Sequence, residues 1–518
     1  MVQRGFVFGV VASVVVGGCF DPLQDVEGDD IQDETSTSGG EGTDEPDTTG
    51  GEIDDASSSG EPSTEGSTTG AVFAQVRAVH AAPDVGPVDI YVAGESTPLF
   101  AGLGYGETTQ RVEVLAGGVP LEFRPAGADT SDEPVFATEL MLAEGEAVTA
   151  VAAGLLESED ENDRFRLLPV VEAWGAPLAG RARARVVHAG ADAPSVYLDV
   201  PGDDDGAVAR FETTPSAGFA LDVAGGERLT LLEDAAGDAA PITSFTAPQV
   251  AEGDEVLLIA TGLTGRLARE PEGFAVLAVG RDGSLGTIRQ DPELFIVHGS
   301  RDAGPLETCT GDVELAANFE YGDIRAARVA PGTYDVGVFD YPSGCGNEPF
   351  SVNTTGALEA GERYLLLVTG EVMPEDAGEA SIQVATFADE FPLGDEDSAR
   401  LRFVHGASYS QIYVGNVVQD QIVETNVYTS PIAWSVESVE VDLMEGFYLL
   451  GIADAVDKPA PPYAPIVTLP FEAVGGARQW AIIAGDPSPE EGDGFLQAMV
   501  VDTSTPRWSV TLADVQLP

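Results

Sequence analysis

Apolar and polar residues form short segments along most of the chain, and Gly, Pro and Asp residues separate these segments. In the region 72–154, for example, the segments are VDIYVAG, QRVEVLAG, PLEFRPAG and AVTAVAAG, which are rich in Val, Tyr and Phe. Short segments of this composition between turn residues are typical of β-strands. No long stretch has the periodicity of an amphipathic helix. The pattern therefore predicts an all-β protein.

One short phrase occurs four times and contains all four histidines of the chain. The copies are VRAVHAAPD, ARVVHAGAD, LFIVHGSRD and LRFVHGASY, which hold His80, His188, His298 and His405. Successive histidines are 108, 110 and 107 residues apart, and in the first three copies a glycine turn and an apolar strand follow at nearly the same distance. A period of this length exceeds that of a solenoid repeat and suits one independent small domain.

About seven strands in ~110 residues are typical of a two-layer β-sandwich. We therefore predict four tandem antiparallel β-sandwich domains, of immunoglobulin-like or transthyretin-like type, of which the last is the most divergent. Their predicted bounds are 72–179, 180–290, 291–397 and 398–518.

The repeated phrase also carries a family resemblance. VRAVHAAPDVGPVDIYVAG followed by LGYGETTQRVEVLAGG, and VHGSRDAGP followed by FEYGDIRAARVAPGTYDVGVFDY, resemble the bacterial family catalogued as domain of unknown function 4397. The second copy, RVVHAGADAPSVYLDV, resembles it through its first strands, whereas the fourth copy lacks the aspartate and the proline. The resemblance implies secreted or surface-anchored β-domains, often in tandem, and it implies no reaction.

The N-terminal region predicts export and a lipid anchor. Arg4 precedes an apolar run at 6–16 that is too short to span a bilayer, and VGGC ends at Cys19. These residues resemble a bacterial lipobox, which implies cleavage after residue 18 and lipidation of Cys19. Phe20 follows in place of the aspartate associated with inner-membrane retention, so we expect anchoring in the outer membrane. The alternative is an ordinary secretory signal with a chance cysteine.

Residues 19–71 are predicted to form a disordered tether. The segment 21–70 contains sixteen Asp or Glu, no Lys or Arg, and long runs of Ser, Thr and Gly, so it cannot bury enough apolar surface to fold. The whole chain has 88 acidic and 24 basic residues, a formal charge of −64. This charge excludes nucleic acid as a direct partner. It fits either a surface adapted to salt or dispersed sites for divalent cations.

Two cysteines remain if Cys19 is lipidated, and we predict that they form a disulfide. An even pair, Cys309 and Cys345, is expected to be oxidised outside the cytoplasm. Closing a loop of this length stabilises the fold by about 4 kcal/mol in the chain-entropy model. The alternative is two free thiols.

The four histidines lie on the more uniformly apolar face of their predicted strands, whereas Arg77, Arg185 and Arg402 lie on the other face. In the structural interpretation, a half-buried imidazole ends the first strand and bonds to loop carbonyls or to a nearby aspartate. The aspartates of the first three copies are Asp84, Asp192 and Asp302, and the fourth copy has Tyr409 there. In the functional interpretation, His and Asp are metal ligands or a base and its orienting acid.

One segment partly matches a calcium-binding loop. Residues 201–212 place Asp203, Asp205 and Glu212 at positions 3, 5 and 12 of an EF-hand pattern, but position 1 is proline and no flanking helices are evident. The acidic segment 157–165 is a second, weaker candidate, and a solvated hairpin tip is the alternative for it. We expect no cofactor, apart from weakly bound calcium as an alternative.

No catalytic set is evident, because any Ser-His-Asp site would have to use a histidine of the repeated phrase. We therefore predict a non-enzymatic surface lipoprotein that acts in adhesion, envelope organisation or ligand capture, with envelope polysaccharide or protein as partner. The second hypothesis is a stalk without a ligand, and the third is a hydrolytic or metal-dependent enzyme that uses one diverged copy. A deep groove or exposed aromatic patch would favour binding, and smooth polar faces would favour the stalk.

Overall fold

The computed structural model describes the chain from residue 71 onward with several gaps. The described residues are 71–200, 206–233, 241–374, 381–392, 397–407, 411–455, 460–485 and 496–513. By compactness, the chain divides into Met1–Thr68 and Thr69–Pro518, and all four repeats lie in the second unit. The predicted signal peptide, Cys19 and almost all of the tether lie outside the described residues. Within them the all-β prediction is confirmed, and the one helical element is the short 3-10 turn η1 (Glu424–Asn426).

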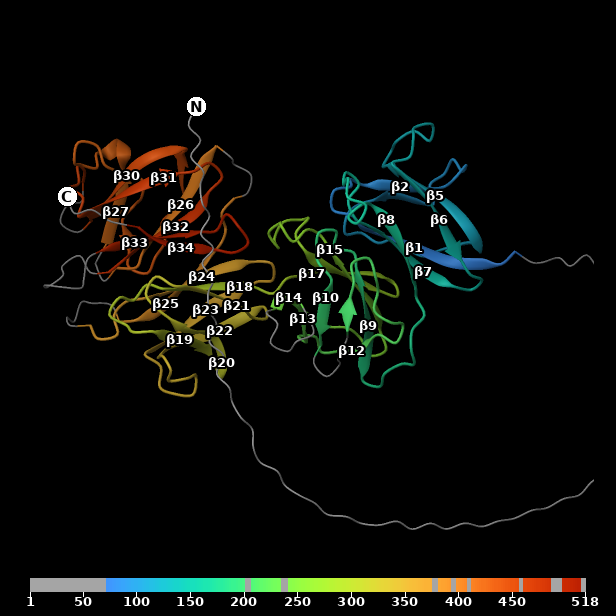
Figure 1. Cartoon of the computed structure of the whole chain (residues 1–518), viewed down its shortest axis with the longest axis horizontal. Coiled ribbons are helices and arrows are strands. Elements are labelled where there is room, and N and C mark those ends of the chain that lie inside the picture. Colours follow the sequence, from blue (N-terminus) through green and yellow to red (C-terminus); the bar gives the residue numbers. More distant parts are fainter. Residues whose placement is uncertain are drawn as a thin grey trace, which may run out of the picture. The chain divides into compact units, whose positions relative to one another are not determined.

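Each repeat folds into two sheets, and the four repeats follow one another in the order of the colours in Figure 1. The strands of the first repeat are β1 (Phe73–Ala81), β2 (Val88–Val92), β3 (Phe100–Leu103), β4 (Val112–Leu115), β5 (Gly117–Pro125), β6 (Phe136–Leu142), β7 (Ala147–Ala153) and β8 (Arg166–Val171). The strands of the second are β9 (Arg181–His188), β10 (Val196–Asp199), β11 (Ala207–Val208), β12 (Phe219–Asp222), β13 (Arg228–Leu232), β14 (Pro241–Thr246), β15 (Glu255–Thr261), β16 (Ala275–Gly280) and β17 (Gly283–Arg289).

The third and fourth repeats use the same plan. The strands of the third are β18 (Glu293–His298), β19 (Leu306–Thr310), β20 (Val313–Phe319), β21 (Ile324–Arg328), β22 (Gly332–Asp340), β23 (Ser351–Leu358), β24 (Arg363–Thr369) and β25 (Gln383–Ala388). The strands of the fourth are β26 (Ser398–His405), β27 (Gln411–Asn416), β28 (Ile432–Ala433), β29 (Val441–Met444), β30 (Gly446–Asp454), β31 (Val467–Ala473), β32 (Arg478–Ala484), β33 (Gln497–Asp502) and β34 (Ser509–Ala513).

The order of strands is the same in all four repeats. In the first repeat it is β4-β1-β7-β8 in one sheet and β3-β2-β5-β6 in the other, and the second and fourth repeats add a fifth strand to the first of these sheets. If the strands are lettered from A to H, the sheets are DAGH and CBEF. Immunoglobulin domains instead join A, B, E and D in one sheet and C, F and G in the other. The order of strands therefore differs from that of the immunoglobulin-like type.

One pair of strands in each repeat is parallel, and the other pairs are antiparallel. The parallel pairs join the first strand with the seventh: β1 with β7, β9 with β15, β18 with β24, and β26 with β32. Parallel strands are usually buried on both faces and read as continuous apolar runs. The seventh strands AVTAVAA and EVLLIAT have this character, and almost every residue in them is buried. The central pair of this sheet is therefore expected to be covered on both sides.

One of the two covering layers is the other sheet of the same repeat. On β1, Val76 and Ala78 point into the core of the first repeat, together with Ile90 and Phe123 from the second sheet. Equivalent cores fill the other three repeats. His80 lies on the same face as Val76 and Ala78, because alternate residues of a strand share a face.

The second covering layer is the neighbouring repeat. The face of β1 and β7 that carries Val79 and Val151 packs against the face of β9 and β15 that carries Val187 and Leu257, and we call this contact the first seam. An equivalent cluster joins the third and fourth repeats through Phe295, Leu367 and Ile482, among others, and we call it the second seam. The repeats are thus docked in two pairs, whereas the repeat length alone suggested independent domains.

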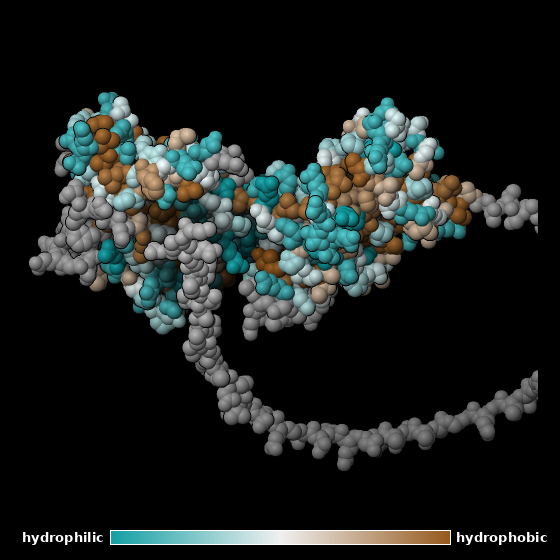
Figure 2. All heavy atoms as spheres, turned by 45° about the horizontal axis from the view of Figure 1, so that its top comes forward, coloured by the Kyte–Doolittle hydropathy of each residue, from teal (hydrophilic) through white to brown (hydrophobic). Residues whose placement is uncertain are grey.

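The outer surface is mixed in character. Figure 2 shows hydrophilic surface over much of the visible face, interrupted by smaller apolar areas. Among the described residues, the most exposed apolar side chains include Phe447, Met373 and Val439, at 84%, 79% and 74% exposure. No helix in the described part of the chain is long and apolar enough to cross a membrane.

Candidate functional site

The repeated histidines are fully buried and lie at the last position of the first strand of each repeat, or in the first repeat at the next-to-last position. The Nε2 atom of His80 lies 3.2 Å from the carbonyl oxygen of Gly86, that of His188 lies 2.8 Å from Pro194 O, and that of His298 lies 3.1 Å from Gly304 O. In each case the carbonyl belongs to the residue six positions after the histidine. Because a carbonyl oxygen only accepts, Nε2–H must be the donor.

Burial favours the neutral form of these rings. Burial lowers the pKa of His80, His188 and His298, and the bond to the loop carbonyl opposes this only in part. In the first repeat, Nδ1 of His80 also accepts from the Ala82 N–H at 3.3 Å. Both nitrogens of that ring are therefore engaged by the backbone. A neutral ring with both nitrogens occupied is poorly suited to act as a metal ligand or a general base.

The aspartates of the repeated phrase bind a different loop. The carboxylate of Asp84 accepts from the backbone N–H groups of Leu156 and Glu157, which follow the seventh strand of that repeat. Asp192 binds Thr264 and Gly265 in the same way, and Asp302 binds Val372 and Met373. The sequence allowed two hydrogen-bond partners for the histidine, a loop carbonyl or the nearby aspartate. In the first three repeats the partner is the loop carbonyl. His and Asp thus tie down two different loops at the same end of the sandwich.

The fourth copy differs in its loop. His405 is fully buried at the end of β26, and Tyr409 lies outside the described residues. The backbone turn is nevertheless shared: the N–H of Ser435 donates to His405 O, as Gly106, Phe211 and Gly322 donate to the histidine carbonyls of the other repeats. All four donors have positive φ. Each of the four repeats therefore has both the buried histidine and this backbone turn.

Only some of the residues of the calcium-site candidates belong to the described part of the chain. Asp203 and Asp205 lie outside the described residues. Glu212 is exposed, and its backbone carbonyl accepts from the His188 N–H. In the acidic segment, the Asp160 carboxylate accepts from the Asn162 N–H within the turn itself, which is the geometry of a capped turn.

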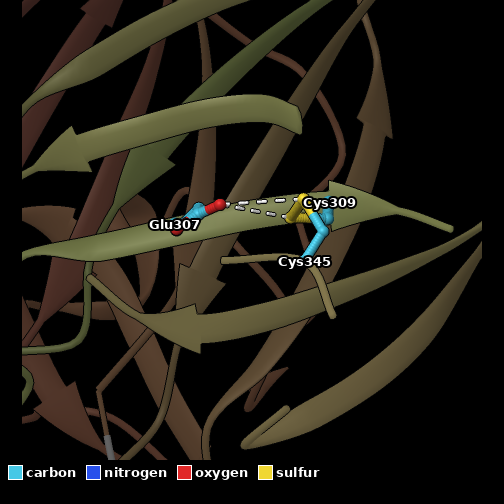
Figure 3. A group of neighbouring side chains, drawn as sticks. All are labelled: Glu307, Cys309 and Cys345. Carbon is cyan, nitrogen blue, oxygen red and sulfur yellow. Dashed lines mark hydrogen bonds between the residues drawn. A yellow bond between two sulfur atoms is a disulfide. The ribbon is translucent and has the colours of Figure 1, made fainter. Parts of the chain in front are cut away.

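A different cluster lies in the third repeat, where Cys309 and Cys345 form the predicted disulfide. Figure 3 shows the carboxyl group of Glu307 directed at this disulfide, with Oε1 3.6 Å from each sulfur. Glu307 is 4% exposed, and its Oε2 accepts from the Gly344 N–H at 3.1 Å. Among the described residues, this is the one group of three or more His, Cys, Asp or Glu side chains whose ligand atoms lie within 4.8 Å of one another.

The seams hold functional arginines that the sequence placed only on the face opposite the histidine. Arg77, three residues before His80, donates to the carbonyl of Gly280 at the end of β16. Arg185, three residues before His188, donates to Val171 at the end of β8, at 2.8 Å. The contacts are reciprocal, because each repeat uses the same position to bind the same strand end of its neighbour. This is the pattern of an isologous two-fold interface, formed here within one chain.

The second seam repeats half of this pattern. Arg402, three residues before His405, donates to the carbonyl of Ala388 at the end of β25. Phe295 occupies the corresponding position of the third repeat and stacks on Trp508, with ring centroids 4.1 Å apart. A buried threonine bond also recurs: Thr261 donates to Ala81 O across the first seam at 2.8 Å, and Thr369 donates to Gly406 O across the second at 2.6 Å.

The sequence contained a signal for the seams. On the strands that contain His80 and His188, the face opposite the histidine carries Val79 and Val187 beside the arginines. A solvent-facing row would be more uniformly polar. An arginine three residues before the histidine, between apolar residues, occurs in the first, second and fourth copies and indicated a shared contact at that position.

Three pockets among the described residues are open to solvent. Their volumes are about 180, 390 and 440 Å³. The pocket of about 390 Å³ is lined by Trp508, Phe295, Arg328 and Glu293, among others. None of these three pockets has a repeated histidine among its lining residues.

Comparison with known families supports the repeated domain. The model of a domain of unknown function, DUF4397, matches residues 74–199 and 292–413. The first match covers repeat 1 and ends in the second strand of repeat 2, and the second match covers repeat 3 and ends in the second strand of repeat 4. These regions are therefore similar to that family.

Two other comparisons add no functional argument. No curated protein matches the chain. One solved structure, the Bacillus anthracis TIE protein, is similar over 82% of this chain and 75% of that chain, with 10% identity and a TM-score of 0.13. A similarity at this score establishes neither a common fold nor a common function.

Proposed function

We propose that this chain is a non-enzymatic lipoprotein of the bacterial cell envelope whose β-domains act in adhesion, envelope organisation or ligand capture. The observation that carries the proposal is the docking of the repeats in two pairs through buried seams. Each pair has a continuous apolar contact and is expected to move as one body. Rigid pairs of β-domains hold their loops in fixed positions, and loops on a rigid scaffold are common binding sites.

The proposed anchor and tether set where these pairs act. Lipidation at Cys19 would hold the chain on the membrane, and the acidic segment behind it would hold the repeats away from the surface. Residue Phe20 after the cysteine favours the outer membrane.

The non-enzymatic part of the proposal is supported by the state of the histidines. Where the described loops allow it to be seen, each ring is buried, has a lowered pKa and contacts a backbone carbonyl. A hydrolytic or metal-dependent enzyme would need an accessible histidine beside a second catalytic group. The bonds of Asp84, Asp192 and Asp302 to a different loop provide no such second group.

A stalk without its own ligand is the second candidate function, and one observation favours it. The three pockets described above are open to solvent, and the described exposed aromatic side chains, such as Phe447 and Phe350, are few. Immobilised full-length protein tested against purified envelope polysaccharides and envelope proteins, with and without calcium, separates the two functions. Saturable binding supports capture or adhesion, and none in either condition supports the stalk.

The anchor is tested by the Cys19→Ser variant. If Cys19 carries the lipid, this change should move the protein from the membrane fraction to the soluble fraction while the repeats stay folded. Radiolabelled fatty acid should enter the natural protein and not the variant. Cys309→Ser is the matched control, because it removes a cysteine of the folded part and should leave both the label and the membrane fraction unchanged. Persistent membrane association of Cys19→Ser would contradict the proposed anchor.

A further inference from the structure

Glu307 is a buried carboxyl group whose environment the fold alone does not explain. It lies on β19 two residues before Cys309, so the two side chains share the outer face of their sheet. The loop 341–350 covers this face, and Glu307 is only 4% exposed. Oε2 accepts from the Gly344 N–H, and the described residues place no Lys or Arg within ion-pair distance of the carboxylate. Burying an acidic group without a cationic partner destabilises a protein, so its position needs a reason.

The other oxygen of the same group faces the two sulfurs. Oε1 lies 3.6 Å from Cys309 Sγ and 3.6 Å from Cys345 Sγ (Figure 3). In the disulfide neither sulfur carries a proton, so neither can donate to this oxygen. Oε1 therefore has no favourable polar contact with the oxidised cysteines. Two thiols, or a cation between the three atoms, would provide one.

The geometry points to a metal site that opens when the disulfide is reduced: we propose that Cys309, Cys345 and Glu307 then bind one thiophilic divalent cation such as zinc. Zinc binds thiolate sulfur at ~2.3 Å and carboxylate oxygen at ~2.1 Å in tetrahedral geometry, which places such an oxygen and sulfur about 3.6 Å apart. Both oxygen–sulfur distances already have this value. Only the two sulfurs, now bonded to each other, must separate, to about 3.8 Å.

The chain around Cys345 permits this movement. Cys309 is fixed in the buried strand β19, but Cys345 is half-buried in the loop 341–350, between Gly344 and Gly346. Glycines on both sides allow backbone changes at little steric cost. The partial exposure of Cys345 gives a reductant access to the disulfide and leaves room for water as a fourth ligand. The bond from Gly344 N–H meanwhile holds the carboxylate in place.

The reaction balances with a thiol reductant. Two molecules of a thiol R–SH reduce the disulfide, and they form R–S–S–R and two cysteine thiols. Binding of M²⁺ then releases the two thiol protons and forms two metal–thiolate bonds, while the Glu307 carboxylate supplies the third ligand. The complex carries three ligand charges against two on the metal. The oxidised form has no thiolate to offer, so binding depends on the redox state.

The test uses the full-length chain with Cys19→Ser, so that Cys309 and Cys345 are its only cysteines. Equilibrium dialysis should find one zinc ion per chain after reduction with a phosphine, and none before reduction. Titration with cadmium should produce thiolate-to-cadmium charge-transfer absorption in the reduced protein alone. Glu307→Gln should weaken zinc binding by about tenfold or more, since even outer-shell partners of a metal contribute about this much.

Glu348→Gln is the matched control, because Glu348 is exposed in the same loop and the change removes the same charge. It should bind zinc as tightly as the parent protein. Circular dichroism establishes that each reduced variant is folded. If Glu307→Gln does not fold, Glu307→Asp replaces it; its shorter side chain draws the carboxylate away from the two sulfurs and should also weaken zinc binding. The proposal is overturned if the folded, reduced protein binds no zinc, if the oxidised protein binds it equally well, or if Glu307→Gln binds like the parent protein. These outcomes do not depend on the proposed envelope function.

Discussion

The two seams join equivalent faces of equivalent repeats with different side chains. The first seam combines small aliphatic residues with two buried arginines, Arg77 and Arg185, which are 1% and 5% exposed. The second seam has one arginine of this kind, Arg402, and fills the other position with Phe295 and the rings of Trp480 and Trp508. The same arrangement of strands can therefore be packed with two different sets of side chains, one mainly aliphatic with arginines and one mainly aromatic.

The difference lies in how each seam satisfies its polar groups. In the first seam, the guanidinium of Arg77 donates to Thr149 and Gly280 and pairs with Glu172 at 3.0 Å, so its charge is compensated inside the contact. In the second seam, aromatic rings bury a larger apolar area for each side chain. A buried arginine at another position, Arg363, pairs there with Asp389 and donates to the carbonyls of Thr503 and Thr505 in the fourth repeat. We therefore expect aromatic truncation to have the largest effects, and loss of an arginine to have smaller ones.

The largest effect is expected for Trp480→Ala in the second seam. Trp480 is fully buried, lies 5.1 Å from the rings of both Phe391 and Trp508, and donates to Glu437. Its removal should lower the free energy of unfolding of the third and fourth repeats by about 4 kcal/mol. Denaturant unfolding followed by circular dichroism measures this change. Unaltered unfolding would show that the second seam contributes little to stability.

A comparison of neighbouring leucines tests whether the first seam is a true core. Leu257 and Leu258 are adjacent on β15, and both are buried, but Leu257 faces the seam and Leu258 faces the core of the second repeat. Each change to Ala should cost about 3 kcal/mol. If the pairs are rigid, Leu257→Ala should also destabilise the first repeat, as measured by hydrogen exchange of β1. A cost below about 1 kcal/mol at Leu257 alone would indicate loosely joined repeats.

The Arg77→Ala change tests the polar part of the first seam. It leaves the Gly280 carbonyl without this donor, while Glu172 keeps its contact with Arg111. We expect a loss of about 2 kcal/mol in the free energy of unfolding, because bonds to charged groups contribute about this amount. Arg281→Ala is the control, because Arg281 pairs with Glu255 in an exposed position and should change stability by less than ~1 kcal/mol. Equal losses of stability in Arg77→Ala and Arg281→Ala would show that the buried arginine contributes no more than an exposed one.

The smallest effect is expected at the histidine turn, which is common to both pairs. His188→Ala should cost about 1–2 kcal/mol, because it leaves Pro194 O without its donor, and it should not alter the metal content. Because burial lowers the pKa of His188, the unfolded chain binds a proton below pH 6.5 more readily than the folded chain does.

Acid therefore favours unfolding through this residue, and its contribution is lost as the pH falls from 7 toward 5. The natural protein should lose more stability over this range than His188→Ala does. Other groups such as Glu293, whose pKa burial raises, act in the opposite direction. The measured quantity is thus the difference between the two proteins at each pH. A difference that does not vary with pH would contradict a buried neutral imidazole.

Much of the architecture was predictable from local patterns. Apolar segments between Gly, Pro and Asp turns predicted strands, and the spacing of the histidines predicted four repeats, because both depend on short-range sequence. Strand periodicity also placed Val76, Ala78 and His80 on one face, which the core of the first repeat confirms. The Cys309–Cys345 pair was predictable because the folded part contains two cysteines.

The candidate metal cluster was only half predictable. Glu307 is two residues before Cys309, and the chain has 88 acidic residues, so no pattern distinguished it. Its burial results from the loop 341–350, which is distant from Glu307 in the sequence but covers it in the structure. The direction of its carboxylate depends on the N–H of Gly344, 37 residues away.

The sequence by itself determined the strand content, the fourfold repetition, the extreme negative charge and the position of each histidine at a strand end, because each of these follows from composition or from the two-residue period of a strand. Tertiary structure alone decided three things: the DAGH and CBEF order, the docking of repeats in pairs, and the meeting of Glu307 with the disulfide. The physical reason is the same in each case. These features depend on which distant surfaces bury one another, and an apolar residue shows that it must be buried without showing what will cover it.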